Sequence, residues 1–477
     1  MTQLIVLVCM YMLVSIGIGL WAARRVRNTA DYALAGRSLP LAMVITATFA
    51  TWFGSETVLG LPGRFIEGGI AGVIEEPFGS GMALILVGMF FARKLYKMDL
   101  LTIGDFYRKR YGKKIELACA IFIILSYLGW VGAQVAALGL VLNLVTEGAV
   151  SVSLGMTIGT FVVLFYTVYG GMWSVAVTDF FQMIIIVAGL IAVAVCASDM
   201  AGGFGQVVTF AASRDLFNPW PEMSLNGWLF WISAAITMMI GSIPQQDVFQ
   251  RVMSARDAKT ILGGMFYILF AFVPMFIVCA AVLAMPGVGE TLLTTDPQRL
   301  LPTLIRDYMP WWLRVLFFGA VLSAVMSTAS ATMLAPATTF VENVLRNFVR
   351  IEGRELPYMR MTLVFFAVAV LTYSLWFEGT AIYDMVAMAY QFPVVGAFWP
   401  LVMGLYWKRA TTQGAWMSIF VGGSVWAVLT FTPAVPSNPL AGVHANVGRC
   451  RFLSVRLTQK RRPLAPLRSA FACPDPC

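Results

Sequence analysis

Three oxygen-bearing positions share one face of an apolar stretch near residue 325. In LSAVMSTAS, Ala324, Ser327 and Thr328 stand at positions i, i+3 and i+4, so a helix would bring one backbone carbonyl and two hydroxyls together. Such oxygens can replace the water shell of a small monovalent cation. Hydroxyls in apolar helices also join neighbouring helices or bond to their own backbone, and this ordinary alternative stays open for the segment alone.

A second unusual stretch is AMVITATFATWFGSETVLGLPG, residues 42–63, which is apolar but carries Glu56, Pro62 and three glycines. In hydrocarbon every backbone N–H and C=O must be paired, so an interrupted helix predicts freed carbonyls that face protein, water or an ion. Carriers with inverted repeats hold sodium with such carbonyls. Close packing of small residues against a neighbouring helix is the alternative.

Glu56 is the boldest candidate outside this ion site. A carboxylate in a membrane span costs about 2.5 kcal/mol or more, so we expect it to face a cavity, a cationic solute or a positive group such as Arg64. A carboxylate that reaches the outer surface is the other interpretation. We expect Glu75 and Glu76 at the membrane interface, while Asp384 fits either setting.

The chain lacks the residues for most other chemistry. Its only histidine is His444, and the cysteines before residue 436 occur singly, so no zinc, haem or iron–sulfur pattern is present. No Gly-rich phosphate loop ending in Lys-Ser or Lys-Thr appears, which argues against an ATP-driven pump within this chain. We therefore predict a protein that is not an enzyme and has no catalytic residues or organic cofactor.

The elements that must position these residues are membrane helices. With 59% hydrophobic and 12% charged residues and a mean hydropathy of +0.79, the chain is expected to be an all-α polytopic membrane protein. Each crossing takes roughly 20 residues, so the length fits about 12 spans in one transport domain, residues 1–435. The expected spans cover residues 3–23, 42–63, 72–91, 116–144, 152–168, 179–197, 227–243, 261–285, 315–339, 361–376, 382–406 and 415–431.

Loop charges predict the orientation. The first span ends in Arg24, Arg25 and Arg27, and the positive-inside rule then places the N-terminus outside. On this topology Arg251 in PQQDVFQR lies in an inner loop. The basic connector at residues 100–114 is expected to anchor to the inner leaflet rather than bind nucleic acid. The Lys and Arg residues before residue 436 that fall outside are Arg64, Arg214, Arg299, Arg306 and Arg314.

Residues 436–477 break the pattern. They hold seven Lys or Arg, six prolines, three cysteines and no apolar run that could cross a bilayer. We expect this tail to be disordered or foreign to the fold, for example through a reading-frame change that replaced a further span.

Four segments taken together resemble the sodium/solute symporter family, which includes the bacterial sodium/proline symporter and the sodium/sugar cotransporters. They are ATWFGSETVLGLPG from Ala50, YTVYGGMWSVAVTDFFQ from Tyr166, IPQQDVFQR from Ile243 and LSAVMSTAS from Leu322. The resemblance implies a five-plus-five inverted-repeat fold, like that of the leucine transporter, with one extra N-terminal helix. The repeats would cover about residues 39–200 and 225–410, and the second and seventh spans would be the broken helices.

The resemblance also implies site residues. In the proline carrier, sodium is held by two carbonyls of the first broken helix and by an Ala-x-x-Ser-Thr face. Aligned through GLPG, the carbonyls fall on Ala50 and Phe53. The face falls on Ala324, Ser327 and Thr328. Asp179, in TDFFQ, matches a family aspartate linked to sodium coupling near the inner exit.

The sequence departs from the proline carrier at two of these positions. Trp52 aligns with an aspartate of that carrier, and Glu56 stands where it has a tryptophan, which argues against proline as the solute. The resemblance still implies sodium-coupled symport of a small organic solute by alternating access, in the inner membrane of a bacterium, with sodium as the coupling ion. A proton-coupled or uncoupled carrier of the same fold, or a truncated inactive carrier or sensor, is the alternative.

Overall fold

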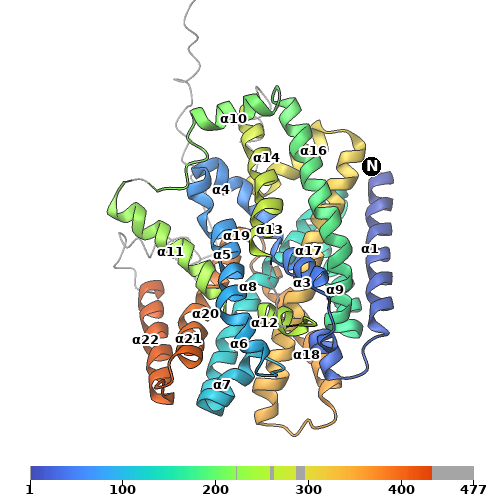
Figure 1. Ribbon diagram of the computed structural model, residues 1–477. Helices are drawn as coiled ribbons and strands as arrows, with labels where there is room; N and C mark the ends of the chain where they lie inside the picture. Colours follow the sequence, from blue (N-terminus) through green and yellow to red (C-terminus); the bar gives the residue numbers. More distant parts are fainter. Residues whose placement is uncertain (1, 222, 258–262, 286–295, 432–477) are drawn as a thin grey trace, which may run out of the picture.

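The computed structural model describes residues 2–221, 223–257, 263–285 and 296–431 (Figure 1). The predicted tail at residues 436–477 lies outside this part of the chain. The described residues are helical apart from turns, loops and one isolated bridge between Leu39 and Ala255. The α-helices are α1 (Thr2–Ala23), α2 (Thr29–Leu34), α3 (Leu41–Trp52), α4 (Leu61–Gly68), α5 (Ser80–Leu86), α6 (Ala92–Tyr96), α7 (Ile103–Tyr111), α8 (Lys113–Val145), α9 (Val152–Met200), α10 (Phe204–Ser213), α11 (Leu225–Gly241), α12 (Gln246–Ser254), α13 (Gly264–Tyr267), α14 (Val273–Ala284), α16 (Leu300–Tyr308), α17 (Trp311–Thr339), α18 (Glu355–Trp376), α19 (Ile382–Ala389), α20 (Gln391–Pro393), α21 (Trp399–Tyr406) and α22 (Thr412–Phe431).

Among the described residues, 8 helices are long and apolar enough to cross a membrane, or 9 if the bent pair α11 and α12 counts as one span. The structure therefore agrees with an integral membrane protein but does not confirm 12 spans. The difference has three sources: the expected second span is interrupted, α9 counts as a single helix, and α22 is not among the candidates.

A sharp kink divides α9. A straight helix of 49 residues would be about 74 Å long at 1.5 Å per residue, more than twice the roughly 30 Å of a hydrocarbon core. The backbone leaves helical geometry at Gly171, with φ 50° and ψ −138°. This residue lies inside the YTVYGGMWSVAVTDFFQ segment, where the sequence predicts a turn between two spans.

The first broken helix is present. Helix α3 ends at Trp52, Phe53 has non-helical backbone angles (φ −84°, ψ 76°), and a π-helical turn at Glu56–Gly60 leads into α4. Pro62 falls in the first turn of α4, where its missing N–H removes no hydrogen bond from the helix interior. The predicted interruption between residues 42 and 63 is therefore confirmed.

A second interruption separates α11 from α12. The two helices are bent by 47° at a short break after Gly241 that contains Pro244. At the first break, Ser55 N donates to Gln134 Oε1 of α8 (2.9 Å), while Gln246, the first residue of α12, accepts through Oε1 from Ile103 N at the start of α7 (2.9 Å). At the first break a protein side chain thus replaces a partner that a continuous helix would supply.

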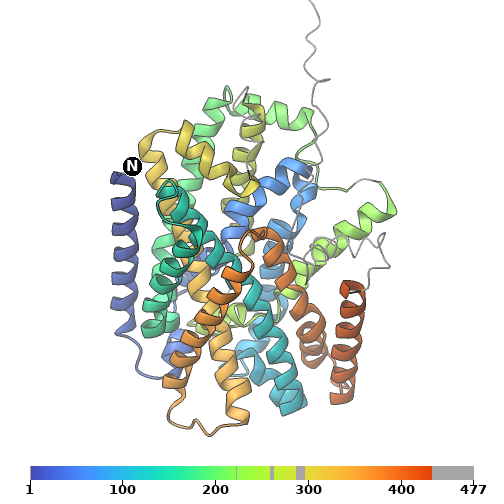
Figure 2. The same ribbon diagram turned by 180° about the vertical axis from the view of Figure 1, so that it is seen from behind.

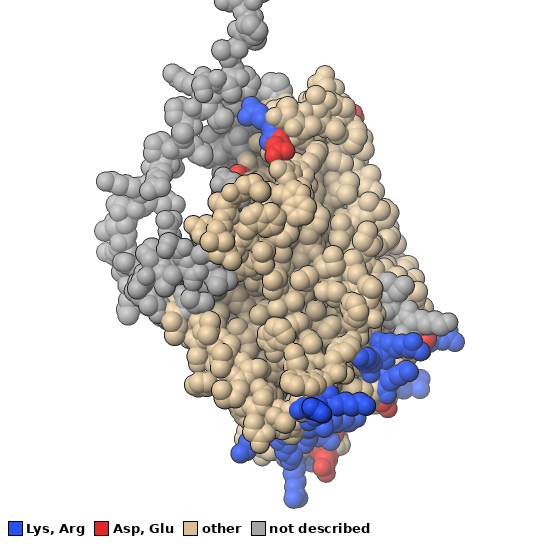
Figure 3. All heavy atoms as spheres, turned by 60° about the vertical axis from the view of Figure 1, so that its left-hand side comes forward, with Lys and Arg blue, Asp and Glu red and all other residues tan. Residues whose placement is uncertain are grey.

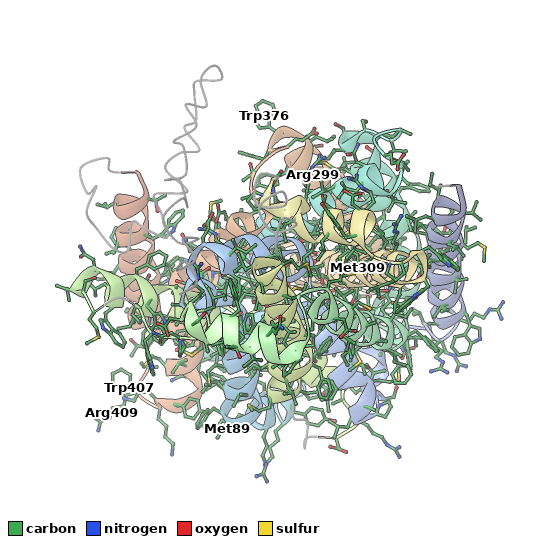
Figure 4. All side chains as sticks on the ribbon, turned by 90° about the horizontal axis from the view of Figure 1, so that it is seen from above. Met89, Arg299, Met309, Trp376, Trp407 and Arg409 are labelled. Atoms are coloured by element: carbon green, nitrogen blue, oxygen red, sulfur yellow. The ribbon has the colours of Figure 1, made fainter. Side chains whose placement is uncertain are left out.

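Helix α17 is the centre of the bundle and α1 is peripheral. In the most apolar stretch of the Trp311–Asn347 span, 83% of the residues are buried inside the protein. In the corresponding stretch of α1 the share is only 22%. Figure 2 shows α1 on one side of the molecule and α22 on the other, and the view from above in Figure 4 repeats this arrangement, with Trp376, Trp407 and Arg409 pointing away from the bundle. Helix α17 packs against α3, α8, α9 and α12, the helices that carry the polar centre described below.

Basic side chains gather at one end of the molecule, at the bottom of the face in Figure 3. Exposed residues of the connector, Lys109, Lys113 and Lys114, contribute to the charge around α7 and α8. Helix α7 also packs against α8 through buried Phe106. Arg251 is different: only 1% of its side chain is exposed, so its assignment to an inner loop is wrong.

Candidate ion and solute site

The predicted ion ligands of α3 and α17 come together. Thr328 Oγ1 lies 3.4 Å from the carbonyl oxygen of Ala50 and donates to the carbonyl oxygen of Ala324 at 3.0 Å. All three residues have an exposed fraction of 0%. The hydroxyl thus makes the ordinary bond to its own helix and also reaches the last turn of α3. These oxygens form the kind of neutral ligand group that suits a monovalent cation.

Asp179 of α9 adds a negative charge beside this group. Ser327 Oγ donates to Asp179 Oδ1 at 2.6 Å, and Thr51 Oγ1 donates to Asp179 Oδ2 at 3.4 Å. Asp179 is fully buried, and the described residues give it no Lys or Arg within ion-pair distance. A buried carboxylate held by two hydroxyls attracts a cation.

Arg251 links the two broken helices. From α12 its guanidinium donates to the carbonyl oxygen of Ala47 (3.3 Å) and to the hydroxyl of Thr51, both on α3. On its own helix it donates to the carbonyl oxygen of Asp247 (2.7 Å) and lies 3.9 Å from the Asp247 carboxylate. A buried arginine with several partners of this kind holds α3 and α12 in one register.

Asp247 also binds Trp52, the residue that aligns with the aspartate of the proline carrier. Trp52 Nε1 donates to Asp247 Oδ2 at 3.1 Å, and Tyr127 OH donates to Asp247 Oδ1 at 2.6 Å. A carboxylate is therefore present at the level of Trp52, but it comes from the second broken helix.

Glu56 lies inside the protein. Trp130 Nε1 donates to one carboxylate oxygen at 3.0 Å and Gln134 Nε2 donates to the other at 2.8 Å, both from one face of α8. Only 2% of Glu56 is exposed, so the interpretation that it reaches the outer surface is wrong. Its suggested pairing with Arg64 is also wrong, because Arg64 forms an ion pair with Asp384. Asp384 of α19 therefore lies in a partly buried ion pair with Arg64.

A second carboxylate, Glu76, faces the same break. Tyr267 OH donates to Glu76 Oε1 at 2.5 Å and lies 2.6 Å from the carbonyl oxygen of Trp52, while Thr57 Oγ1 lies 3.4 Å from Glu76. Glu75 and Glu76 have exposed fractions of 8% and 2%, so both carboxylates are enclosed by protein; their expected level at the membrane interface stays a prediction. Glu56 and Glu76 thus bring two carboxylates, held by neutral donors, to one interruption.

Phe53 is the remaining predicted ligand. It lies at the end of α3 with its side chain buried, and within the described residues no hydrogen bond joins it to α17. Sequence reasoning missed Asp247, Gln134 and Glu76 as parts of the centre. For Asp247 a signal existed, because its spacing of four from Arg251 in PQQDVFQR puts an acid and a base on one helical face.

The architecture defines a class of protein: a helical membrane carrier with two interrupted spans around a buried polar centre. The chain belongs to the sodium:solute symporter family, whose family model matches residues 32–422. The resemblance stated from the sequence is thereby confirmed.

Curated relatives are transporters rather than enzymes. High-affinity choline transporter 1 of Caenorhabditis elegans is 26% identical over 88% of this chain and 76% of its own length. The high-affinity proline transporter PutP of Bacillus subtilis is 28% identical over 86% and 89%, and the sodium/glucose cotransporter of Vibrio parahaemolyticus is 24% identical over 90% and 85%.

Two solved structures share the fold. A substrate-bound, outward-open Na⁺-coupled sialic acid symporter has a TM-score of 0.78 and 17% identity, with 95% of this chain and 99% of that chain covered. Mhp1, a nucleobase-cation-symport-1 family transporter in a closed conformation, has a TM-score of 0.54 and 15% identity, with 88% and 99% covered.

Proposed function

We propose that this protein is a secondary active transporter that couples the entry of sodium to the uptake of a small organic solute. The observation that carries the proposal is the approach of Thr328 Oγ1 to the carbonyl oxygen of Ala50, with the Ser327–Asp179 hydrogen bond beside it. The cation would lie between α3 and α17, bound by Ala50, Phe53, Ala324, Ser327 and Thr328. Asp179 would take part in the release of this cation toward the inner side of the membrane.

The solute would bind at the interruption of the first broken helix. Glu56 is buried there against Trp130, whose ring packs 5.3 Å from the ring of Tyr390. A carboxylate next to aromatic faces favours a solute with a positive charge. The names of relatives contain choline, proline and glucose. Of these three kinds of solute, a carboxylate such as Glu56 favours those that carry a positively charged nitrogen over the sugar.

Transport would follow alternating access, with two inverted repeats at about residues 39–200 and 225–410 and 12 spans in all. The basic end of the molecule supports an orientation with the N-terminus outside. The membrane would be the inner membrane of a bacterium. One charge moving down 100 mV supplies about 2.3 kcal/mol and a tenfold sodium gradient about 1.4 kcal/mol. Together they could concentrate a neutral solute roughly several hundredfold.

Uptake by proteoliposomes tests the proposal. A panel of radiolabelled amines, amino acids, sugars and carboxylates is offered with sodium, lithium or proton gradients imposed one at a time. We expect accumulation of an amine that requires the sodium gradient. Uptake driven by the proton gradient alone, or insensitive to sodium replacement, would instead favour the proton-coupled or uncoupled carrier, and no uptake of any compound would favour the inactive one.

A further inference from the structure

A cavity of about 390 Å³ opens where α1 and α17 begin and α8 ends. These three helices are candidate spans, so their ends mark the boundary between hydrocarbon and water. Trp311 lines the cavity with 65% of its surface exposed, as expected of a tryptophan at the headgroup level. The cavity is therefore placed to receive a molecule from the membrane surface.

Four charged side chains surround the polar part of the cavity. Arg306 donates two hydrogen bonds to the neighbouring Asp307, at 2.7 and 3.0 Å, and Arg314 donates from Nε to the carbonyl oxygen of Met309 at 2.8 Å. Glu147 completes the set from the end of α8. These hydrogen bonds from Arg306 hold the pKa of Asp307 below its ordinary value, so this carboxylate stays charged in neutral and mildly acidic solution.

The rest of the cavity wall is apolar. Leu4 of α1 and Val315 and Phe318 of α17 line it, next to the charged residues. A ligand that fits has a phosphate for the arginines, an amine for the carboxylates and an apolar chain for this wall. Two positive and two negative side chains match a zwitterion better than an anion.

We propose that this cavity binds the headgroup of phosphatidylethanolamine, with the first carbons of one acyl chain against Leu4, Val315 and Phe318. The primary amine matters, because it can donate hydrogen bonds to Glu147 and Asp307, whereas the quaternary amine of phosphatidylcholine cannot. The lipid would fasten α1, the least buried of the candidate spans, to α8 and α17. This site is separate from the ion and solute site and does not depend on its function.

Native mass spectrometry of the full chain tests the proposal. Delipidated protein is titrated with phosphatidylethanolamine, phosphatidylcholine or phosphatidylglycerol, and we expect at least tenfold tighter binding of the first. Arg314→Gln should weaken that binding tenfold or more. Arg214→Gln, which removes an exposed arginine outside the cavity, should leave it unchanged.

Glu147→Gln separates the role of the amine from that of the phosphate. This exposed position tolerates substitution, and the variant should lose the preference for phosphatidylethanolamine over phosphatidylcholine while it still binds both. Equal affinity for all three lipids, or unchanged binding by Arg314→Gln, would overturn the proposal. So would soluble phosphoethanolamine binding as tightly as the lipid, because the apolar wall would then contribute nothing.

Discussion

Ser327 and Thr328 present two hydroxyls that a cation at this site would share. Removal of either oxygen, in Ser327→Ala or Thr328→Ala, should raise the sodium concentration for half-maximal uptake tenfold or more, because a hydrogen bond or ligand contact to a charged group contributes about 1.5–3 kcal/mol. Sodium titration of uptake measures this. Thr332→Ala is the control, because the Thr332 hydroxyl bonds to the carbonyl oxygen of Thr328 within α17. Normal sodium activation in both site variants would contradict the proposed cage.

Glu56 is expected to determine the charge of the solute. Glu56→Gln keeps the size of the side chain and one oxygen that can accept from Trp130 or Gln134, while the other donor loses its acceptor at a cost of about 1–3 kcal/mol. The protein should therefore fold with a lower Tm. Uptake of a cationic solute should fall at least tenfold, while sodium binding, measured by protection against heating, should persist. If the variant transported the same cation with normal KM and kcat, Glu56 would not bind the solute.

Arg251 is expected to be essential for stability. Arg251→Met removes the partner of a fully buried Asp247, and such a change costs about 3–5 kcal/mol. In thermal unfolding, the purified variant should have a much lower Tm than the parent protein. The double variant Arg251→Met/Asp247→Asn should recover part of this loss, since neither position of the former ion pair then carries a charge. A single variant as stable as the parent would show that the Asp247 carboxylate is compensated by other groups.

The kink in α9 is the clearest prediction about an element. Gly171 has a positive φ, and a Cβ there would overlap the carbonyl oxygen of Tyr32, so Gly171→Ala should strongly reduce the yield of folded protein and its Tm. Gly319→Ala in α17 is the matched control, because that glycine has open space around it and alanine favours helix. Equal yields and Tm values for the two variants would contradict this account of the kink.

Local composition predicted the interruption of the first broken helix but not its surroundings. Gly54, Pro62 and Glu56 mark the break because each is unfavourable in a lipid-facing helix. Glu76 has the same kind of neighbours, Pro77 and Gly79, but it stands at the expected start of the third span, where a turn at the membrane surface also explains them. Its burial arises from a second interrupted segment, Ile74–Gly79, that packs beside the first. Arg251 looked like a loop charge because the bend that turns α12 into the protein cannot be read from hydropathy.

At the scale of the whole molecule the testable property is orientation. In a cysteine-free background, Asp307→Cys lies at the end where α1 begins and Lys113→Cys at the basic end. If the N-terminus is outside, a membrane-impermeant maleimide should label the first variant in intact cells and the second only after permeabilisation. The reverse pattern would mean that the N-terminus faces the cytoplasm, against the distribution of basic residues.

The bonds of Arg251 limit how the carrier can move. One guanidinium is attached to the backbone of α3 and to the backbone of α12, so these two discontinuous helices cannot separate without exposing a buried charge. They would travel as a single piece while the surrounding scaffold tilts about them. A compound wedged between that piece and α17 would then arrest the cycle without ever touching the place where the solute sits.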